Sequence, residues 1–315
     1  MKNLLIYLML ATILIVTGCK KDNNDNHEPE YEYRLIELTS STQRSNEDIV
    51  IFTYNDSDKV SSWLGIYDGV EEYKAEVVYP NENTVEFLLY DIFNGVNELE
   101  EKIVYTFDNN QNISMVMGYY SNGTQLIIDY KSTFFYNTDG NVIQTNYYEI
   151  DDGNEELSSK NDFTYNGSLL LEHTIFLYNG ASLVPILKTT YNHDNGLLNN
   201  SIDSYFDNNE WNESNKNEFF YNNDAVEVIN SYTNSGGNAW EISYTTNYTY
   251  DDDGNMVSSE EESSFGYSYL ESYTYEQKSG NLSIFDFYNN YGYPNPIYNP
   301  NPKGNYILRN ILKNK

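Results

Sequence analysis

Few residues of this chain have the type and spacing that metal or nucleophilic chemistry requires. The three histidines, His27, His173 and His193, are too far apart in the sequence to form a zinc-ligand motif, and we expect them to face solvent. Because the chain contains 48 acidic residues, a catalytic carboxylate pair cannot be recognised by spacing. Gly-x-Ser-x-Gly, phosphate-loop and dinucleotide-binding motifs do not occur. The sequence therefore predicts no metal centre, no cofactor and no enzymatic activity, with turn carboxylates as the alternative source of glycosidase-like catalysis.

One acidic segment imitates the ligand spacing of a calcium loop. Asp251, Asp253 and Asn255 alternate, and Glu262 follows at the distance of a twelfth-position ligand. The sixth position is Met256 instead of Gly, and no helical pattern flanks the segment. We expect an ordinary acidic turn here, with a calcium site as the alternative.

The single cysteine, Cys19, is placed for covalent modification. It follows Lys2 and an apolar segment over residues 4–16, which together are typical of a secretory signal rather than a membrane span. The sequence Val16-Thr17-Gly18-Cys19 resembles the lipobox of bacterial lipoproteins. This resemblance implies cleavage after residues 1–18 and lipidation of the Cys19 thiol, the alternative being a free or buried thiol.

The segment after Cys19 predicts where the protein is held. Residues 20–30 are polar and without pattern, which indicates a solvated tether. Lys20 beside the lipidated cysteine resembles the signal of lipoproteins sorted to the outer membrane, and lysine followed by acids resembles the signal for its outer face. We therefore expect a palmitate-bearing lipoprotein at the cell surface; a linker facing the periplasm is the alternative.

Three large rings form a candidate binding rim. Trp211, Trp240 and Phe265 each precede a repeat tyrosine by the same number of residues. Equivalent positions of successive repeats lie side by side in a sheet, so these rings are expected along one rim, where they can stack on sugar rings or on an apolar protein surface. The alternative is that they cover the sheet's own tyrosine layer.

These candidates must be positioned by a repeat that fills most of the chain. An aromatic-x-aromatic pair followed by a polar turn recurs about every 28 residues, and a second turn rich in Gly and Asn lies between consecutive copies. Two turns in each unit leave two strands of roughly ten residues. The sequence thus predicts about nine tandem hairpins. The second aromatics of the nine copies are Tyr54, Tyr79, Phe107, Tyr136, Tyr165, Tyr191, Tyr221, Tyr250 and Tyr275.

The expected fold class is all-β: a single extended antiparallel sheet, twisted and curved, of about eighteen strands. The array should occupy residues 47–290, after residues 19–46 with the tether and a first strand at Tyr31–Thr39. A transmembrane barrel of similar size is disfavoured, because polar residues such as Gln144 and Thr145 occupy both faces of the strands and leave no apolar band for lipid.

The best copies of the motif, Tyr248–Val257 and Phe134–Val142, read Tyr-x-Tyr-Asp or Phe-x-Tyr-Asn with a following Gly-Asn. They resemble the YD repeats of the RHS family, in which Tyr-Asp and a later Gly mark each hairpin of a long spiralling sheet. The copies at Val78 and Phe219 lack the Gly. The resemblance covers residues 50–290, and small bacterial lipoproteins with such repeats are the nearer likeness.

Charge limits the partners. A formal net charge of -31 excludes ordinary binding to phosphate backbones, so no nucleic acid is expected.

Residues 291–315 are rich in proline, lysine and arginine and contain no acid, which predicts a cap over the last open strand; a basic docking tail is the alternative. The whole pattern predicts an outer-membrane or cell-surface lipoprotein that acts by non-catalytic binding or as a structural module, with a glycan or a surface protein as the possible ligand.

Overall fold

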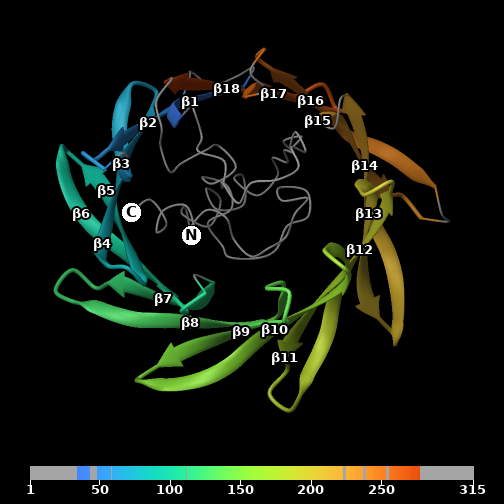
Figure 1. The fold of residues 1–315 in the computed structure, drawn as a ribbon, viewed down its shortest axis with the longest axis horizontal. Coiled ribbons are helices and arrows are strands. Elements are labelled where there is room, and N and C mark those ends of the chain that lie inside the picture. Colours follow the sequence, from blue (N-terminus) through green and yellow to red (C-terminus); the bar gives the residue numbers. More distant parts are fainter. Residues whose placement is uncertain are drawn as a thin grey trace.

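The computed structural model describes residues 34–42, 48–57, 59–110, 112–222, 225–236, 239–252 and 255–276. These residues form one 18-stranded antiparallel sheet, in which each strand pairs with its neighbours in sequence and β1 pairs with both β2 and β18. The sheet therefore closes into a barrel, seen as a ring in Figure 1. The strands are β1 (Arg34–Thr42), β2 (Asp48–Tyr54), β3 (Val60–Tyr67), β4 (Val70–Asn81), β5 (Thr84–Phe93), β6 (Val96–Phe107), β7 (Ile113–Ser121), β8 (Leu126–Tyr136), β9 (Val142–Asp151), β10 (Asn154–Asn166), β11 (Leu169–Tyr178), β12 (Leu183–Asp194), β13 (Leu197–Asp207), β14 (Glu210–Asn222), β15 (Ala225–Asn234), β16 (Trp240–Tyr250), β17 (Met256–Ser263) and β18 (Ser268–Glu276).

The all-β class and the antiparallel hairpin array are confirmed, but the expected extended sheet is wrong because the sheet closes. From β2 to β17, every pairing of successive strands contains a register shift. A bulge bends its strand and increases the local twist. Bulges repeated in the successive pairings from β2 to β17 therefore curl the sheet until its first and last strands meet. No helix of the described part is long and apolar enough to cross a membrane.

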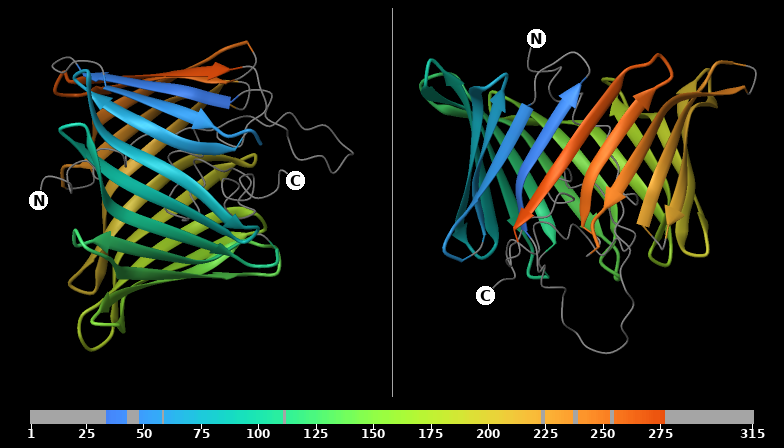
Figure 2. Two further views of the ribbon diagram at one scale, coloured as in Figure 1. Left: turned by 90° about the vertical axis from the view of Figure 1, so that its left-hand side faces the viewer. Right: turned by 90° about the horizontal axis from the view of Figure 1, so that it is seen from above.

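Closure depends on β1, which supplies a strand to the last repeat. The final motif, Tyr273 to Tyr275, ends β18, and its partner strand is β1. Tyr275 pairs with Leu35 beside a bulge, as Tyr250 pairs with Met256 in the preceding hairpin. Figure 2 shows β1 and β18 running side by side in opposite directions. The first strand, expected at 31–39 and found at Arg34–Thr42, thus belongs to the array.

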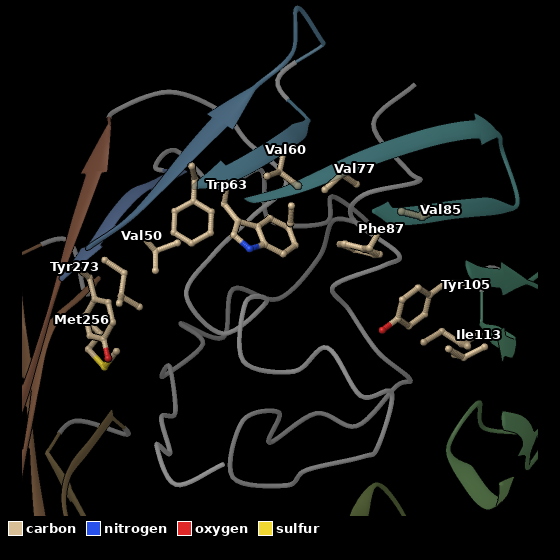
Figure 3. Close-up of a cluster of buried hydrophobic side chains, with 14 of the residues drawn as sticks. Val50, Val60, Trp63, Val77, Val85, Phe87, Tyr105, Ile113, Met256 and Tyr273 are labelled. Atoms are coloured by element: carbon tan, nitrogen blue, oxygen red, sulfur yellow. The ribbon is translucent and has the colours of Figure 1, made fainter. Parts of the chain in front are cut away.

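The buried side chains lie on the inner face of the sheet. Figure 3 shows Val50, Trp63, Phe87 and Tyr105 pointing toward the interior of the ring. Their rings contact across neighbouring strands: the centroids of Trp63 and Phe87 are 5.8 Å apart, and those of Phe87 and Tyr105 are 5.4 Å apart. Aromatic burial of this kind supplies the packing that a sheet poor in aliphatic residues needs.

In five of the motifs, a tyrosine hydroxyl joins the motif to the hairpin before it. Five hydroxyls donate to a backbone carbonyl oxygen at the start of a strand in the preceding repeat, at distances of 2.7 or 2.8 Å. The acceptor residues are themselves buried against the tyrosine rings. Neighbouring hairpins are therefore joined by a side-chain bond as well as by the strand ladder. The pairs are Tyr79 with Val60, Tyr136 with Ile113, Tyr165 with Val142, Tyr221 with Leu198 and Tyr250 with Val226.

The Asn or Asp that follows the tyrosine closes the turn. The Oδ1 atom of Asn137 accepts hydrogen bonds from the backbone N–H groups of Asp139 and Asn141. Asp108 and Asn55 make the same two bonds in their own turns. A side-chain acceptor at this position replaces backbone partners that a tight turn lacks. The Tyr-Asp or Tyr-Asn pair thus combines a bond between hairpins with a bond within one.

The structure corrects the sixth copy of the motif. In most repeats, the second motif aromatic pairs with a residue just after a bulge; we call this the anchor position. In the sixth copy His193, not Tyr191, occupies it, because His193 pairs with Leu198 after a bulge as Tyr165 pairs with Leu170. The imidazole is partly buried, and its Nδ1 atom has no hydrogen-bond partner. Burial lowers the pKa of His193. This repeat therefore lacks the tyrosine bond that its neighbours make.

We expect His193→Tyr to stabilise the barrel, because the new hydroxyl can donate to the carbonyl of Leu170, the equivalent acceptor. Tyr165→Phe, which removes such a bond, should destabilise it. Each change should be about 1 kcal/mol in the free energy of unfolding. Denaturant titration measures both, with Phe220→Tyr on the outer wall as a control expected to change little. A destabilised His193→Tyr protein would contradict the assignment of His193 to the anchor position.

Candidate binding surface

The two ends of the barrel carry different turns. Successive strands alternate in direction, so the motif turns after even-numbered strands lie at one end, here the motif-turn end, and the Gly- and Asn-rich second turns after odd-numbered strands lie at the other, here the second-turn rim. Both ends are visible in Figure 2. On the rim, Asp68, Asn94, Asp152 and Asn208 have positive φ, as the sequence predicted for tight hairpins.

The second-turn rim exposes apolar side chains. All the large apolar residues of the described part that are more than half exposed lie there. Phe265, one of the three rings of the predicted rim, is the most exposed of them at 84%. Single exposed apolar residues are ordinary, but a set gathered at one end of a molecule is typical of an interaction surface. The set consists of Val70, Phe93, Val96, Phe265 and Tyr267.

Carboxylates oppose one another on the same rim. Asp91 pairs directly with Glu98 across the β5–β6 hairpin, and Asp207 pairs with Glu210 across β13–β14. Near the β9–β10 turn, Glu149 opposes Glu156. Like charges placed opposite each other destabilise a strand pair. The opposed carboxylates on the rim therefore repel each other, and this repulsion does not serve the packing of the barrel.

The outer wall carries a belt of lysines that sequence reasoning missed. One lysine per repeat, five residues before the anchor, faces outward from β4 to β14 and lies within ion-pair distance of a carboxylate. The regular spacing of these lysines was the signal that would have revealed the belt. The pairs are Lys74 with Glu76, Lys102 with Glu86, Lys131 with Glu155, Lys160 with Asp162, Lys188 with Glu172 and Lys216 with Glu218.

Trp211 and Trp240 lie on the outer wall where this belt meets the rim. Each stands at or next to the first residue of a strand that leaves a second turn, one repeat apart, as predicted. The Nζ of Lys188 lies 4.7 Å from the centre of the Trp211 ring, and that of Lys216 lies 5.5 Å from the centre of the Trp240 ring. Trp211 also packs on Phe206, with ring centroids 5.1 Å apart. Both indoles are partly buried and partly open to solvent.

The remaining chemical candidates are structural or lie outside the described residues. His173 was expected to face solvent, but it is largely buried. Its ring stacks on Phe163, and one ring nitrogen is hydrogen-bonded to Asn161. Burial lowers the pKa of His173 to about 4, so the imidazole is neutral at pH 7. Cys19 lies outside the described residues, as does the proposed cap at 291–315.

The structure separates the two ends of the calcium-like spacing. Asp251 accepts hydrogen bonds from the backbone and side chain of Asn255 within the motif turn. Glu262 lies at the far end of β17, beside Ser268 at the second-turn rim, roughly 20 Å away at about 3.3 Å per residue. The two carboxylates cannot share an ion. No group of three or more metal-ligating side chains occurs among the residues that the structure describes.

A scan against protein-family models and a search of curated proteins found no match. Similar solved structures include a porin-like protein from Bacteroides uniformis, with a TM-score of 0.44, 14% identity, and coverage of 79% of this chain and 99% of that one. A porin-like protein from Bacteroides vulgatus has a TM-score of 0.37 and 13% identity over 77% of this chain and 98% of that one. The Tc holotoxin pore of Photorhabdus luminescens has a TM-score of 0.26 and 10% identity over 71% of this chain and 14% of that one. These TM-scores are low, and the barrel assignment rests on the chain's own strand pairing.

Proposed function

We propose that this chain is a lipid-anchored β-barrel protein of the cell envelope that works by non-catalytic binding through its second-turn rim. The observation that carries the proposal is the difference between the two ends of the barrel. The rim gathers the most exposed apolar side chains of the described residues. The motif turns are rich in Asn, Asp and Gly, and those that begin at Asn55, Asp108 and Asn137 are held by side-chain caps. One end is therefore suited to a partner and the other to water.

The course of the chain supports an orientation for this rim. Arg34, at the start of β1, and Glu276, at the end of β18, both lie at the motif-turn end. A lipid on Cys19 would hold the chain through the segment that leads into Arg34. The motif-turn end then lies nearer the membrane, and the rim points away from it.

The lysine belt supports a barrel held outside the bilayer. A barrel that spans lipid keeps an apolar band on its outer face, and a charged residue near the middle of that band costs about 2 to 4 kcal/mol. This chain places charged pairs on the outer wall of β4, β6, β8, β10, β12 and β14.

The anchor is tested by Cys19→Ser. The change removes the only thiol that can carry the lipid, so the protein should take up no labelled palmitate and should no longer fractionate with the outer membrane. Metabolic labelling followed by membrane fractionation measures both. A Cys19→Ser protein that still incorporates palmitate would rule out the anchor.

Orientation is tested by introducing one cysteine at each end. Ser264 lies on the second-turn rim and Asp56 in a motif turn, and both are exposed. Because Cys19 is the only native cysteine and its thiol is blocked when lipidated, Ser264→Cys or Asp56→Cys would add the only free thiol. A bulky maleimide added to intact cells should label Ser264→Cys faster than Asp56→Cys. Faster labelling of Asp56→Cys would reverse the orientation, and labelling only after lysis would assign the protein to the periplasm.

Glycan capture is the second candidate, and the pair Trp211 and Trp240 favours it. Indole rings that repeat along a wall can stack on successive sugar rings. A lysine ammonium group lies over each indole ring, and this cation–π contact fixes the position of the ring before a ligand binds.

Replacing both Trp211 and Trp240 by Ala should leave the barrel folded. Each substitution removes a cation–π contact worth about 0.5 to 1 kcal/mol at an exposed site. Trp63→Ala is the matched control, because Trp63 is only 7% exposed and its loss should cost about 3 to 5 kcal/mol. Thermal melts compare the two. If the double variant loses as much stability as Trp63→Ala, the rings are packing elements and the glycan site is ruled out; if it folds normally, a glycan array then tests binding.

A further inference from the structure

Apolar exposure and opposed carboxylates coincide at one corner of the second-turn rim. The β3–β4 and β5–β6 hairpins are adjacent, because β4 pairs with β5. Val70 on the first tip is 60% exposed, and Phe93 and Val96 on the second are 68% and 58% exposed. Phe93 and Val96 pair directly, so their side chains form one apolar tip. We call the Val70, Phe93 and Val96 side chains with their neighbouring carboxylates the acidic apolar corner.

The carboxylates of this corner crowd one another. Asp91 opposes Glu98 two residue pairs below the apolar tip, and both are exposed. Partial burial raises the pKa of Glu100, and the nearby Asp91 and Glu98 carboxylates raise it further. On the neighbouring tip, Glu71 and Glu72 follow Val70 directly. Negative charge is therefore concentrated around the apolar side chains.

The lysines nearest to this corner in the sequence do not neutralise its charge. The sequence has no lysine or arginine from residue 68 to 73 or from 91 to 101. The next ones, Lys74 and Lys102, lie in the lysine belt, where their ammonium groups bind Glu76 at 2.7 Å and Glu86 at 2.9 Å. The described residues of these two hairpin tips therefore supply no positive charge that complements the corner.

We propose that the acidic apolar corner docks a basic segment of a partner protein that carries apolar side chains among its lysines and arginines. The apolar residues of the partner would cover Phe93, Val96 and Val70, and its cations would lie against Asp91 and Glu98. Charge complementarity of this kind speeds encounter and selects the partner, while buried apolar contacts supply most of the affinity. A second copy of the chain is a poor occupant, because both copies would bring a net charge of -31. This inference rests on the proposed function, in which the rim faces away from the membrane.

The test uses the full chain in mild detergent and a short fluorescent peptide of alternating lysine and leucine. The peptide should bind with an affinity that falls as salt is added. Two double variants, Asp91→Asn with Glu98→Gln and Phe93→Ser with Val96→Ser, should each weaken binding about tenfold. The control, Asp139→Asn with Asp194→Asn, removes the same charge from exposed residues of the motif-turn end and should change binding less than about twofold.

Three results would overturn the proposal. If the control variant weakens peptide binding as much as the corner variants do, the peptide is attracted by the overall negative charge of the protein and not by the corner. A matched peptide of lysine and glutamine that binds as tightly would remove the role of the apolar tip. Unchanged binding in either corner variant would place the site elsewhere.

Other occupants give distinct results that also overturn it. A thermal shift with calcium that Asp91→Asn with Glu98→Gln abolishes would reassign the corner to a cation. An oligomer that Phe93→Ser with Val96→Ser dissolves would reassign it to a second copy.

A thermal melt shows that each variant is folded. Because Asp91→Asn with Glu98→Gln relieves a like-charge pair, its melting midpoint should rise. The proposed function is tested by a different measurement. If Ser264→Cys is not labelled on intact cells, the rim does not face outward. Peptide binding in detergent does not depend on that orientation.

Discussion

The hydrogen bond from a motif tyrosine to a carbonyl of the preceding hairpin is the interaction on which the rest of this barrel depends. A two-stranded hairpin alone is marginal in water, so each repeat needs its neighbour. The hydroxyl of Tyr165 reaches Val142 only from the inner face and only in one register. A slip by one residue would turn the ring to the outer wall. The bond thus fixes which face is buried as well as which hairpins touch.

Local features of this fold could be predicted from the sequence, and its closure could not. Alternating aromatic residues and Asn-Gly turns act over a few residues, so they indicated the hairpins and the positive φ of residues such as Asn94. Closure joins Leu38 to Tyr273 and Leu35 to Tyr275, which lie at opposite ends of the array. No local pattern reports that pairing. His193 was missed for a related reason. The motif was recognised by its tyrosines, whereas the position of the bulge between Asn192 and His193 is known only from the strand pairing.

The candidate site shows the same division. Trp211, Trp240 and Phe265 were placed at the second turns from periodicity alone, and they lie there. The contacts of the two indoles with Lys188 and Lys216 depend on which residues face each other across strands, and so does the opposition of Asp91 and Glu98. The lysine belt stood in the sequence as a regular spacing, but its carboxylate and aromatic partners are known only from the register.

The use of β1 as the partner of β18 has a consequence for synthesis of the protein. During translation, β1 leaves the ribosome first and must wait, while the other strands are made, for the one segment that can complete its pairing. Until then the growing sheet presents an open edge, which is a site for aggregation or for chaperones. A chain that stops before β18 leaves that edge open permanently. The ring therefore distinguishes finished polypeptides from unfinished ones, and quality control in the cell can act on the difference.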